Sequence, residues 1–238
     1  MINDIRTVFW KERREQSLKG IRSVASARTL VLLILVGGIL PYEFRTLWTH
    51  SLVSVFAAIW VTFYGVTTVM ADSIAGERER RTLEALLSTP LSRAAIVWGK
   101  MLAAVSDGWG RMLLAMLVAL IASNWAQSWQ QWHGYSLLTW VGIVVDGGLA
   151  GSMAAGLGLW VSTQSHSVRQ AQQILSGSAL GLAFIPLILQ SFFHVSFLTT
   201  LRAMPNTVQI LEMSTVLLSL NVLFLAVGQW NFRRSDRI

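Results

Sequence analysis

Long apolar stretches alternate with short charged stretches along this chain. Six of the apolar stretches are long enough for an α-helix to cross the hydrocarbon core of a membrane, which takes about 20 residues. They lie at roughly 29–48, 51–72, 96–123, 136–162, 170–191 and 207–230. The pattern therefore predicts an all-α membrane protein with six transmembrane helices, in which residues 1–238 form a single transmembrane domain.

Composition narrows the class of protein further. Of the 238 residues, 53% are hydrophobic and 13% are charged, whereas a soluble domain has about 25% charged residues. This difference argues against a large soluble helical core. The chain has no cysteine, which excludes disulfides, thiolate metal sites and cysteine nucleophiles. The net charge of +7 would suggest nucleic acid as a partner of a soluble protein, but in a membrane protein we expect no such partner.

The placement of the basic residues predicts the orientation of the chain. Sixteen of them flank one side of the predicted helices, and only Arg45 and Arg202 flank the other. By the positive-inside rule, both termini are then cytoplasmic. The sixteen are Arg6, Lys11, Arg13, Arg14, Lys19, Arg22, Arg28, Arg78, Arg80, Arg81, Arg93, Lys100, Arg169, Arg233, Arg234 and Arg237.

The first 28 residues are predicted to form an amphipathic helix on the cytoplasmic membrane surface. Apolar residues recur there at helical spacing among charges. They are Ile2, Ile5, Val8, Phe9, Leu18 and Ile21. A solvated basic tail is the alternative. A cleavable signal peptide is not expected, because the basic region is too long and no small-residue cleavage site follows the apolar run.

A charged segment, "ERERRTLEALLSTP" at 77–90, separates the second and third predicted spans. As a helix over residues 73–88 it would carry an apolar stripe of Ile74, Leu83, Leu86 and Leu87. Its charges would form the i,i+4 pairs Glu77–Arg81 and Arg80–Glu84. Thr89-Pro90 indicates a turn, and Ser92 fits the N-cap of the next helix. Mixed charge beside a leucine stripe is typical of a docking helix for a cytosolic partner, and an ordinary solvated loop is the alternative.

This segment also resembles a known family. The stretch "GERERRTLEALLSTPLSRAAIVWGK" at 76–100 is similar to the segment after the second span in permeases of the ABC type-2 exporter family. A Glu-Arg run, a Thr-Leu-Glu, a Leu-Leu-x-x-Pro and a closing Gly-Lys occur in the family's order. "VSTQSHSVRQAQQ" at 161–173 and "MPNTVQILE" at 204–212 resemble later parts of the same family. The resemblance covers essentially the whole chain.

The resemblance implies a function for the segment at 73–90 as a coupling helix that docks on a separate ATPase subunit. It implies a permease dimer with two ATPase subunits in a bacterial or archaeal cytoplasmic membrane, and a re-entrant element at 192–206. The sequence has no G-x-x-x-x-G-K-[ST] phosphate loop, so ATP and Mg²⁺ are expected on the partner and no cofactor on this chain. The coupling residues would be Glu77, Arg78, Arg80, Arg81, Thr82, Leu83, Glu84, Leu87 and Pro90.

Three charged residues lie within the predicted spans. Asp107 and Arg111 are i,i+4 neighbours, and Arg111 lies about 16 Å from Lys100 along the helix, near the membrane midplane. Asp146 reaches a similar depth. Because a charge at this depth costs about 2.5–3.5 kcal/mol, we expect Arg111 to pair with Asp107, Asp146 or both, joining the third and fourth spans. The pair would fix helix register or line the transport path.

Other features leave alternatives open. The same three charges would serve as a proton relay in an ATP-independent secondary transporter. An intramembrane enzyme is disfavoured, because none of the four histidines is close to another and no Ser-His-Asp element is visible. The pairs Gly147–Gly151 and Ser152–Gly156 predict close helix packing, within one chain or between two chains. Tryptophans at the outer boundary predict an aromatic belt or, alternatively, a stacking surface for substrate; they are Trp48, Trp125, Trp129, Trp132 and Trp140. The sequence does not reveal the substrate.

Overall fold

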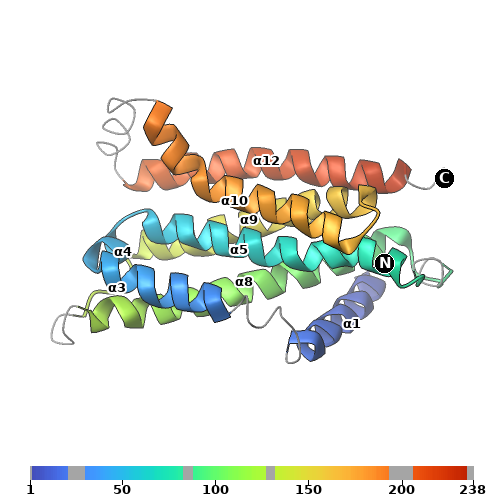
Figure 1. The fold of residues 1–238 in the computed structure, drawn as a ribbon, viewed down its shortest axis with the longest axis horizontal. Coiled ribbons are helices and arrows are strands. Elements are labelled where there is room, and N and C mark those ends of the chain that lie inside the picture. The colour runs from blue at the N-terminus through green and yellow to red at the C-terminus, as the bar shows by residue number, and fades with distance from the viewer. Residues whose placement is uncertain (1, 21–29, 83–87, 127–131, 193–205, 235–238) are drawn as a thin grey trace.

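The structure is a computed structural model that describes residues 2–20, 30–82, 88–126, 132–192 and 206–234. Within these ranges the chain is helical throughout, with short connections (Figure 1). The elements are α1 (Ile2–Gly20), η1 (Leu35–Ile39), α3 (Leu40–Phe44), α4 (Thr46–His50), α5 (Val53–Ser73), α6 (Ala75–Glu79), α8 (Arg93–Trp125), α9 (Leu137–Gln164), α10 (Val168–Phe192) and α12 (Asn206–Arg234).

Four helices among the described residues are long and apolar enough to cross a membrane. They are Val53–Glu79, which joins α5 and α6, together with α8, α9 and Thr207–Trp230 of α12. These helices correspond to the second, third, fourth and sixth predicted spans. The predicted fifth span, 170–191, corresponds to α10, which is one helix of 25 residues but is not among the four. The all-helical membrane class is confirmed, while the count of six spans stays a prediction.

The first predicted span, 29–48, is not a single helix. The apolar helix extends over Leu30–Phe44 and contains the five-residue π-helical turn η1. It is about 22 Å long, shorter than the roughly 30 Å of hydrocarbon in a membrane. The proline Pro41 lies at the start of α3, directly after this turn, and its missing N–H interrupts regular α-helical bonding. Arg45 then has φ of 49°, and this left-handed residue ends α3 before α4 begins.

The helix α9 lies at the centre of the bundle. It packs against α5 and α12 most extensively, and also against α8 and α10. Figure 1 shows α5, α8 and α9 side by side along the long axis, with α10 and α12 on one side of them and α1 oblique at one end. The large fully buried side chains come mainly from α5, α8 and α9; they include Val66, Met70, Met112, Met116, Ile143 and Leu159.

Glycines let the central helices approach closely. A Cβ atom on Gly108 of α8 would lie 2.6 Å from the Val66 side chain of α5, and one on Gly151 of α9 would lie 3.0 Å from Thr62 of α5. A Cβ on Gly156 would lie 2.8 Å from the carbonyl carbon of Phe224 in α12. The small residues of α9 therefore pack within this chain, which is the first of the two alternatives that the sequence left open.

The helix α12 contacts α9 through one stripe of residues along its length. Ser214 of this stripe bonds to Asp146, and the amide of Asn221 donates to the Leu149 carbonyl over 2.9 Å and also to the Ser152 hydroxyl. The stripe residues are separated by alternating steps of four and three, as in the seam between two coiled helices; they are Ile210, Ser214, Leu217, Asn221, Phe224 and Gly228. Elsewhere α12 is exposed, as at Leu211 and Val222, each 65% exposed.

The aromatic residues at the opposite end of the bundle from α1 do not all form a belt. Trp48 is fully buried, and its indole N–H donates to the Tyr135 hydroxyl over 2.8 Å. Burial raises the pKa of Tyr135 to about 12, so its hydroxyl stays neutral. Trp125 and Trp132 are 65% and 52% exposed, as a belt requires. The prediction that Trp48 belongs to the belt is wrong, because its contact with Tyr135, distant in sequence, could not be predicted. Trp129 lies outside the described residues.

The close contact at Gly156 generates a stability prediction. Gly156→Ala adds a Cβ within 2.9 Å of the Leu225 backbone nitrogen, so α9 and α12 must separate. We expect the free energy of unfolding to fall by about 1–3 kcal/mol, measured as a lower unfolding temperature in detergent. Gly110→Ala in α8 is the matched control, because a Cβ there meets no atom within 4 Å. Equal losses in the two variants would contradict the assigned contact.

Candidate functional site

The charged segment begins at a bend between α5 and α6. At this bend the backbone N–H groups of Ile74 and Ala75 both donate to the Ser162 hydroxyl of α9, over 3.1 and 3.0 Å. Since buried N–H groups must find an acceptor, Ser162 makes the bend possible in an apolar environment. The end of α5 is thereby fixed to the last turn of α9.

Arg78 caps the C-terminal end of α9. Its guanidinium donates to the carbonyl oxygens of Ser165 over 3.0 Å and Thr163 over 3.1 Å. The last carbonyls of a helix have no partner within the helix and carry partial negative charge, so a guanidinium is well suited to them. Arg78 therefore holds the connection between α9 and α10 in place.

The next two charges make two further links. The carboxylate of Glu79 accepts the backbone N–H of Val168, the first residue of α10, over 2.9 Å. A carboxylate is favourable at this position, because the first N–H groups of a helix lack acceptors. Arg80 forms an ion pair with Asp72 of α5 at 3.2 Å. The charges of α6 and of Arg80, which directly follows it, thus connect the ends of α5, α9 and α10.

Glu77 connects this region to α8 and α1 through Lys100. The ammonium of Lys100 lies 3.4 Å from Glu77 of α6 and 2.7 Å from Glu12 of α1. Lys100 is 5% exposed, so the two carboxylates are needed to compensate its buried charge. We call Lys100, Glu12 and Glu77 the buried ion triad. The α1 helix packs closely beside it, because a Cβ on Gly99 would lie 2.6 Å from Val8.

The structure corrects the predicted helix over 73–90. The helix ends at Glu79, and Arg81 takes φ of 55°. The N–H of Thr82 donates to the Glu77 carbonyl over 2.9 Å and that of Arg81 to the Arg78 carbonyl over 3.1 Å. These two bonds with a left-handed residue between them form a Schellman motif, which terminates a helix. This end was not predictable from the sequence, because glycine usually occupies the position that Arg81 takes.

The predicted residues of this segment therefore have different environments. Of the two expected i,i+4 pairs, Glu77–Arg81 is replaced, because Glu77 contacts Lys100 and Thr82. Arg80 contacts Asp72, and its expected partner Glu84 is not described. Arg81, Thr82 and Pro90 are exposed. Leu83, Glu84 and Leu87 lie outside the described residues. Ser92 is the N-cap of α8, as predicted, and accepts the Ala95 N–H over 3.2 Å.

The three charges within the predicted spans separate into two sites. Arg111 pairs with Asp107 on α8 at 2.5 Å, as one of the alternatives predicted. Asp146 is fully buried and accepts the Ser214 hydroxyl of α12 at 2.5 Å, so it links α9 to α12 rather than to α8. Its second carboxylate oxygen has no hydrogen-bond partner. The link between α8 and α9 is made instead by the Trp109 indole, which donates to the Val144 carbonyl over 3.2 Å.

The part of the chain that the structure describes contains no group of three or more His, Asp or Glu side chains that could hold a metal ion. The expectation that no two histidines are close is wrong for one pair, because the rings of His50 and His133 lie 5.8 Å apart. Their positions, 83 residues apart in sequence, concealed this contact.

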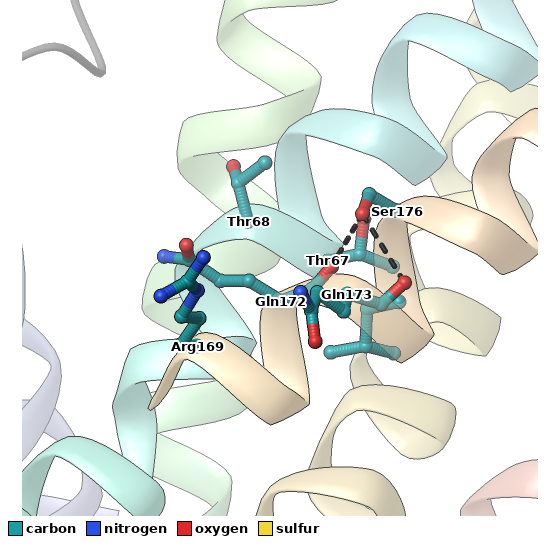
Figure 2. A pocket seen from close by; sticks show the side chains of 7 residues that line it. Thr67, Thr68, Arg169, Gln172, Gln173 and Ser176 are labelled. Carbon is teal, nitrogen blue, oxygen red and sulfur yellow. Dashed lines mark hydrogen bonds between the residues drawn. The ribbon is translucent and has the colours of Figure 1, made fainter. Parts of the chain in front are cut away.

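A pocket of about 270 Å³ lies between α5 and α10. Figure 2 shows Thr67 and Thr68 on one helix and Arg169 with its polar neighbours on the other. No carboxylate lines this pocket. The lining residues are Thr67, Thr68, Arg169, Gln172, Gln173, Leu175 and Ser176.

Comparison with known proteins identifies the family. The family described as "ABC-2 family transporter protein" matches residues 15–237 of the chain. This chain belongs to the ABC-2 transporter family. The ABC-2 resemblance of the charged segment is thereby confirmed, and the chain is a multi-pass membrane protein of that family.

A named relative supports the same assignment. Over 118 residues, or 47% of this chain, the sequence is 29% identical to the ABC transporter permease protein NatB of Bacillus subtilis (strain 168). The matched part covers 30% of that relative's length. The similarity therefore concerns part of a permease protein that is considerably longer than the match.

The buried ion triad generates a second prediction. Lys100→Met leaves Glu12 and Glu77, whose side chains are only 14% and 13% exposed, without their cation. We expect the free energy of unfolding to fall by about 3–5 kcal/mol, measured by thermal unfolding in detergent. Adding Glu12→Gln and Glu77→Gln to Lys100→Met should restore part of the loss.

Lys11→Met is the matched control for this prediction. Lys11 pairs with Glu15 at 3.6 Å, and the two side chains are 52% and 43% exposed. A surface pair of this kind contributes at most about 1 kcal/mol. Similar losses for Lys100→Met and Lys11→Met would show that the triad has no special role.

Proposed function

We propose that this chain is the membrane-spanning permease subunit of an ATP-driven ABC exporter. In this proposal two permease chains form the substrate pathway, and each contacts a separate ATP-binding cassette subunit that carries ATP and Mg²⁺. Both termini are cytoplasmic and six spans cross the cytoplasmic membrane; the re-entrant element expected at 192–206 lies outside the described residues except for its two ends. Membership of the ABC-2 family and the similarity to a permease protein support the proposal.

The observation that supports the coupling role is that the charged segment contains both residues that bond to other helices and residues that are exposed. Its inner charges, Glu77 and Arg78, bond to α8 and to the end of α9. Its following residues, Arg81 and Thr82, are exposed, as are 88–90 beyond the gap in the described residues. A partner that binds the exposed residues would therefore act on a turn fixed to the ends of α5, α8, α9 and α10.

The inner charges give this turn the stiffness that coupling requires. Five links leave α6 and the bend before it, to Ser162, the carbonyls of Ser165 and Thr163, the Val168 N–H, Asp72 and Lys100. Charge-assisted hydrogen bonds are stronger than neutral ones and more directional. A displacement of the turn would therefore move the helix ends with it.

Charge reversal at Arg81 tests the docking surface. Arg81→Glu should lower the affinity for a co-expressed ATP-binding cassette subunit about tenfold or more, which corresponds to about 1.4 kcal/mol. The unfolding temperature should change little, because Arg81 is exposed. Co-purification and ATP-hydrolysis rates of the complex measure the effect.

Arg45→Glu is the matched control. Arg45 is also an exposed arginine with positive φ, and it follows α3 at the far end of the bundle from α6 (Figure 1). It should leave binding unchanged. Glu77→Lys should instead destabilise the chain itself, because it places a second cation beside Lys100. Unchanged complex formation and ATP hydrolysis in Arg81→Glu would refute docking at this turn.

The alternative function is an ATP-independent secondary transporter, and one observation favours it. Asp146 is fully buried and one of its oxygens has no partner, as expected of a carboxyl group that binds and releases a proton. The predicted relay would then use Asp146 as one proton-binding site and the separate Asp107–Arg111 pair as another. An uncoupler would abolish such transport, and ATP would not affect it.

Asp146→Asn separates the two functions. The asparagine keeps an oxygen that accepts the Ser214 hydroxyl, so the link between α9 and α12 should survive. Under the permease proposal, ATP-dependent transport of a candidate substrate in vesicles should stay within about threefold of the parent protein, a change below 1 kcal/mol. Transport that is lost in Asp146→Asn, with unchanged unfolding temperature and ATP binding to the partner, would favour the proton relay.

A further inference from the structure

The pocket between α5 and α10 offers hydrogen-bond donors without a carboxylate. Three of its hydroxyls already donate to carbonyls of their own helices: Thr67 to Tyr64 over 2.9 Å, Thr68 to Gly65 over 2.7 Å, and Ser176 to Gln172 over 2.5 Å. The free donors are the side chains of Arg169, Gln172 and Gln173, which line the same pocket. A guanidinium with two amides suits a ligand that carries a negative charge and several acceptor oxygens.

The size of the pocket limits what it can hold. Sites that enclose a drug-sized molecule measure about 300–1,000 Å³, and this pocket measures about 270 Å³. It has room for a compact anionic group such as a glycerol phosphate, but not for a whole amphiphile. The rest of an amphiphilic ligand would have to lie outside the pocket.

The exposed face of α10, which continues directly from the pocket, offers a surface for the rest of such a ligand. Five exposed residues recur on one face, at steps of four, four, three and four: Arg169, Gln173, Gly177, Leu180 and Phe184. The face is polar at its start and apolar at its end, where Leu180 and Phe184 are each 53% exposed. Between the two, a Cβ atom on Gly177 would meet no atom within 4 Å, and neither would one on Gly181 beside Leu180, so this surface is open.

The dimensions match one leaflet of a bilayer. The distance along the helix from Gln173 to Phe184 is about 16 Å, and half of the hydrocarbon core of a bilayer is about 15 Å. In the proposed topology α10 begins at the cytoplasmic face, so Arg169 lies at the level of the inner headgroups. Anionic lipids concentrate in that leaflet and are attracted to basic residues there.

We propose that this pocket binds the phosphate-bearing headgroup of an anionic phospholipid of the cytoplasmic leaflet. Arg169, Gln172 and Gln173 donate to the phosphate oxygens, and one acyl chain lies along Gly177 and Leu180. The bound lipid contacts α5 and α10 together, one helix on each side of its headgroup. The proposal rests on the proposed membrane topology and not on which substrate is exported.

Lipid retention by the full-length protein tests the proposal. The protein is purified in detergent with phosphatidylglycerol or phosphatidylcholine, and the bound lipid is counted by native mass spectrometry. We expect phosphatidylglycerol to be retained preferentially, and Arg169→Gln to weaken its binding about tenfold or more, as loss of a hydrogen bond to a charged group does. Arg14→Gln is the matched control, because Arg14 is an exposed arginine of α1 outside the pocket.

A second variant tests the acyl-chain surface. Gly177→Phe fills the open face without removing a donor, so phosphatidylglycerol retention should fall about tenfold while glycerol 3-phosphate binding stays unchanged. Equal retention of the two lipids, an unchanged Arg169→Gln variant, or equal effects of Arg169→Gln and Arg14→Gln would overturn the proposal. Glycerol 3-phosphate binding as tight as that of the lipid would identify a soluble phosphate compound as the ligand and would also overturn it.

The test of lipid binding is independent of the test of coupling to the ATP-binding cassette subunit. Lipid retention is measured on the permease chain, whereas coupling is measured by co-purification of the ATP-binding cassette subunit with the Arg81→Glu variant. If lipid retention fails and co-purification depends on Arg81, only the lipid proposal is wrong. If lipid retention succeeds and co-purification is indifferent to Arg81, the coupling proposal is wrong and the lipid site stands.

Discussion

The buried ammonium of Lys100 is the constraint on which the end of the bundle that holds α1 and α6 depends. A cation with 5% exposure is tolerated only when carboxylates compensate it, and here they come from two other helices, α1 and α6. The positions of three elements are thereby tied to one atom. Gly99 contributes as well, because its missing side chain lets Val8 approach α8 directly beside Lys100.

From this centre the contacts extend through the bundle in a defined order. Glu77 is part of the triad, and its neighbour Arg78 holds the carbonyl end of α9. Further towards its N-terminus, α9 carries Gly156 and Asp146, which contact α12. A rigid helix thus connects the charged turn to the last helix of the chain. Coupling between distant sites requires such a continuous set of packed elements, each able to take more than one position.

The sequence predicted those features that depend on local pattern. Apolar run length located α5, α8, α9 and α12, the hydroxyl of Ser92 marked the start of α8, and i,i+4 spacing paired Asp107 with Arg111. Prediction from the sequence failed where a residue distant in the chain determines the local conformation or burial. Ser162 bends the chain at Ile74 from 88 positions away, and Tyr135 draws Trp48 inward from 87 positions away.

The charged segment shows the same limit. Its composition and its resemblance to the ABC-2 family predicted a coupling site, and of these the family membership is shown. Helical periodicity, however, could not foresee that Arg81 would adopt a left-handed conformation, which glycine or asparagine adopts more readily. Nor could it separate Glu77 and Arg78, which serve the fold, from Arg81, which is exposed. That separation depends on Lys100, Thr163 and Ser165, all remote in sequence.

The single contact stripe of α12 has a consequence for how the protein is made. Synthesis proceeds from the N-terminus, so α5, α8 and α9 enter the membrane while α12 is still unmade. During that interval Asp146 and the hydroxyl of Ser152 have no Ser214 or Asn221 to bond to. In the half-made chain Asp146 therefore lacks the hydroxyl that it binds in the finished bundle, and an uncompensated carboxyl group at this depth is costly. Arrival of the last helix is then the step that supplies this partner and completes the bundle.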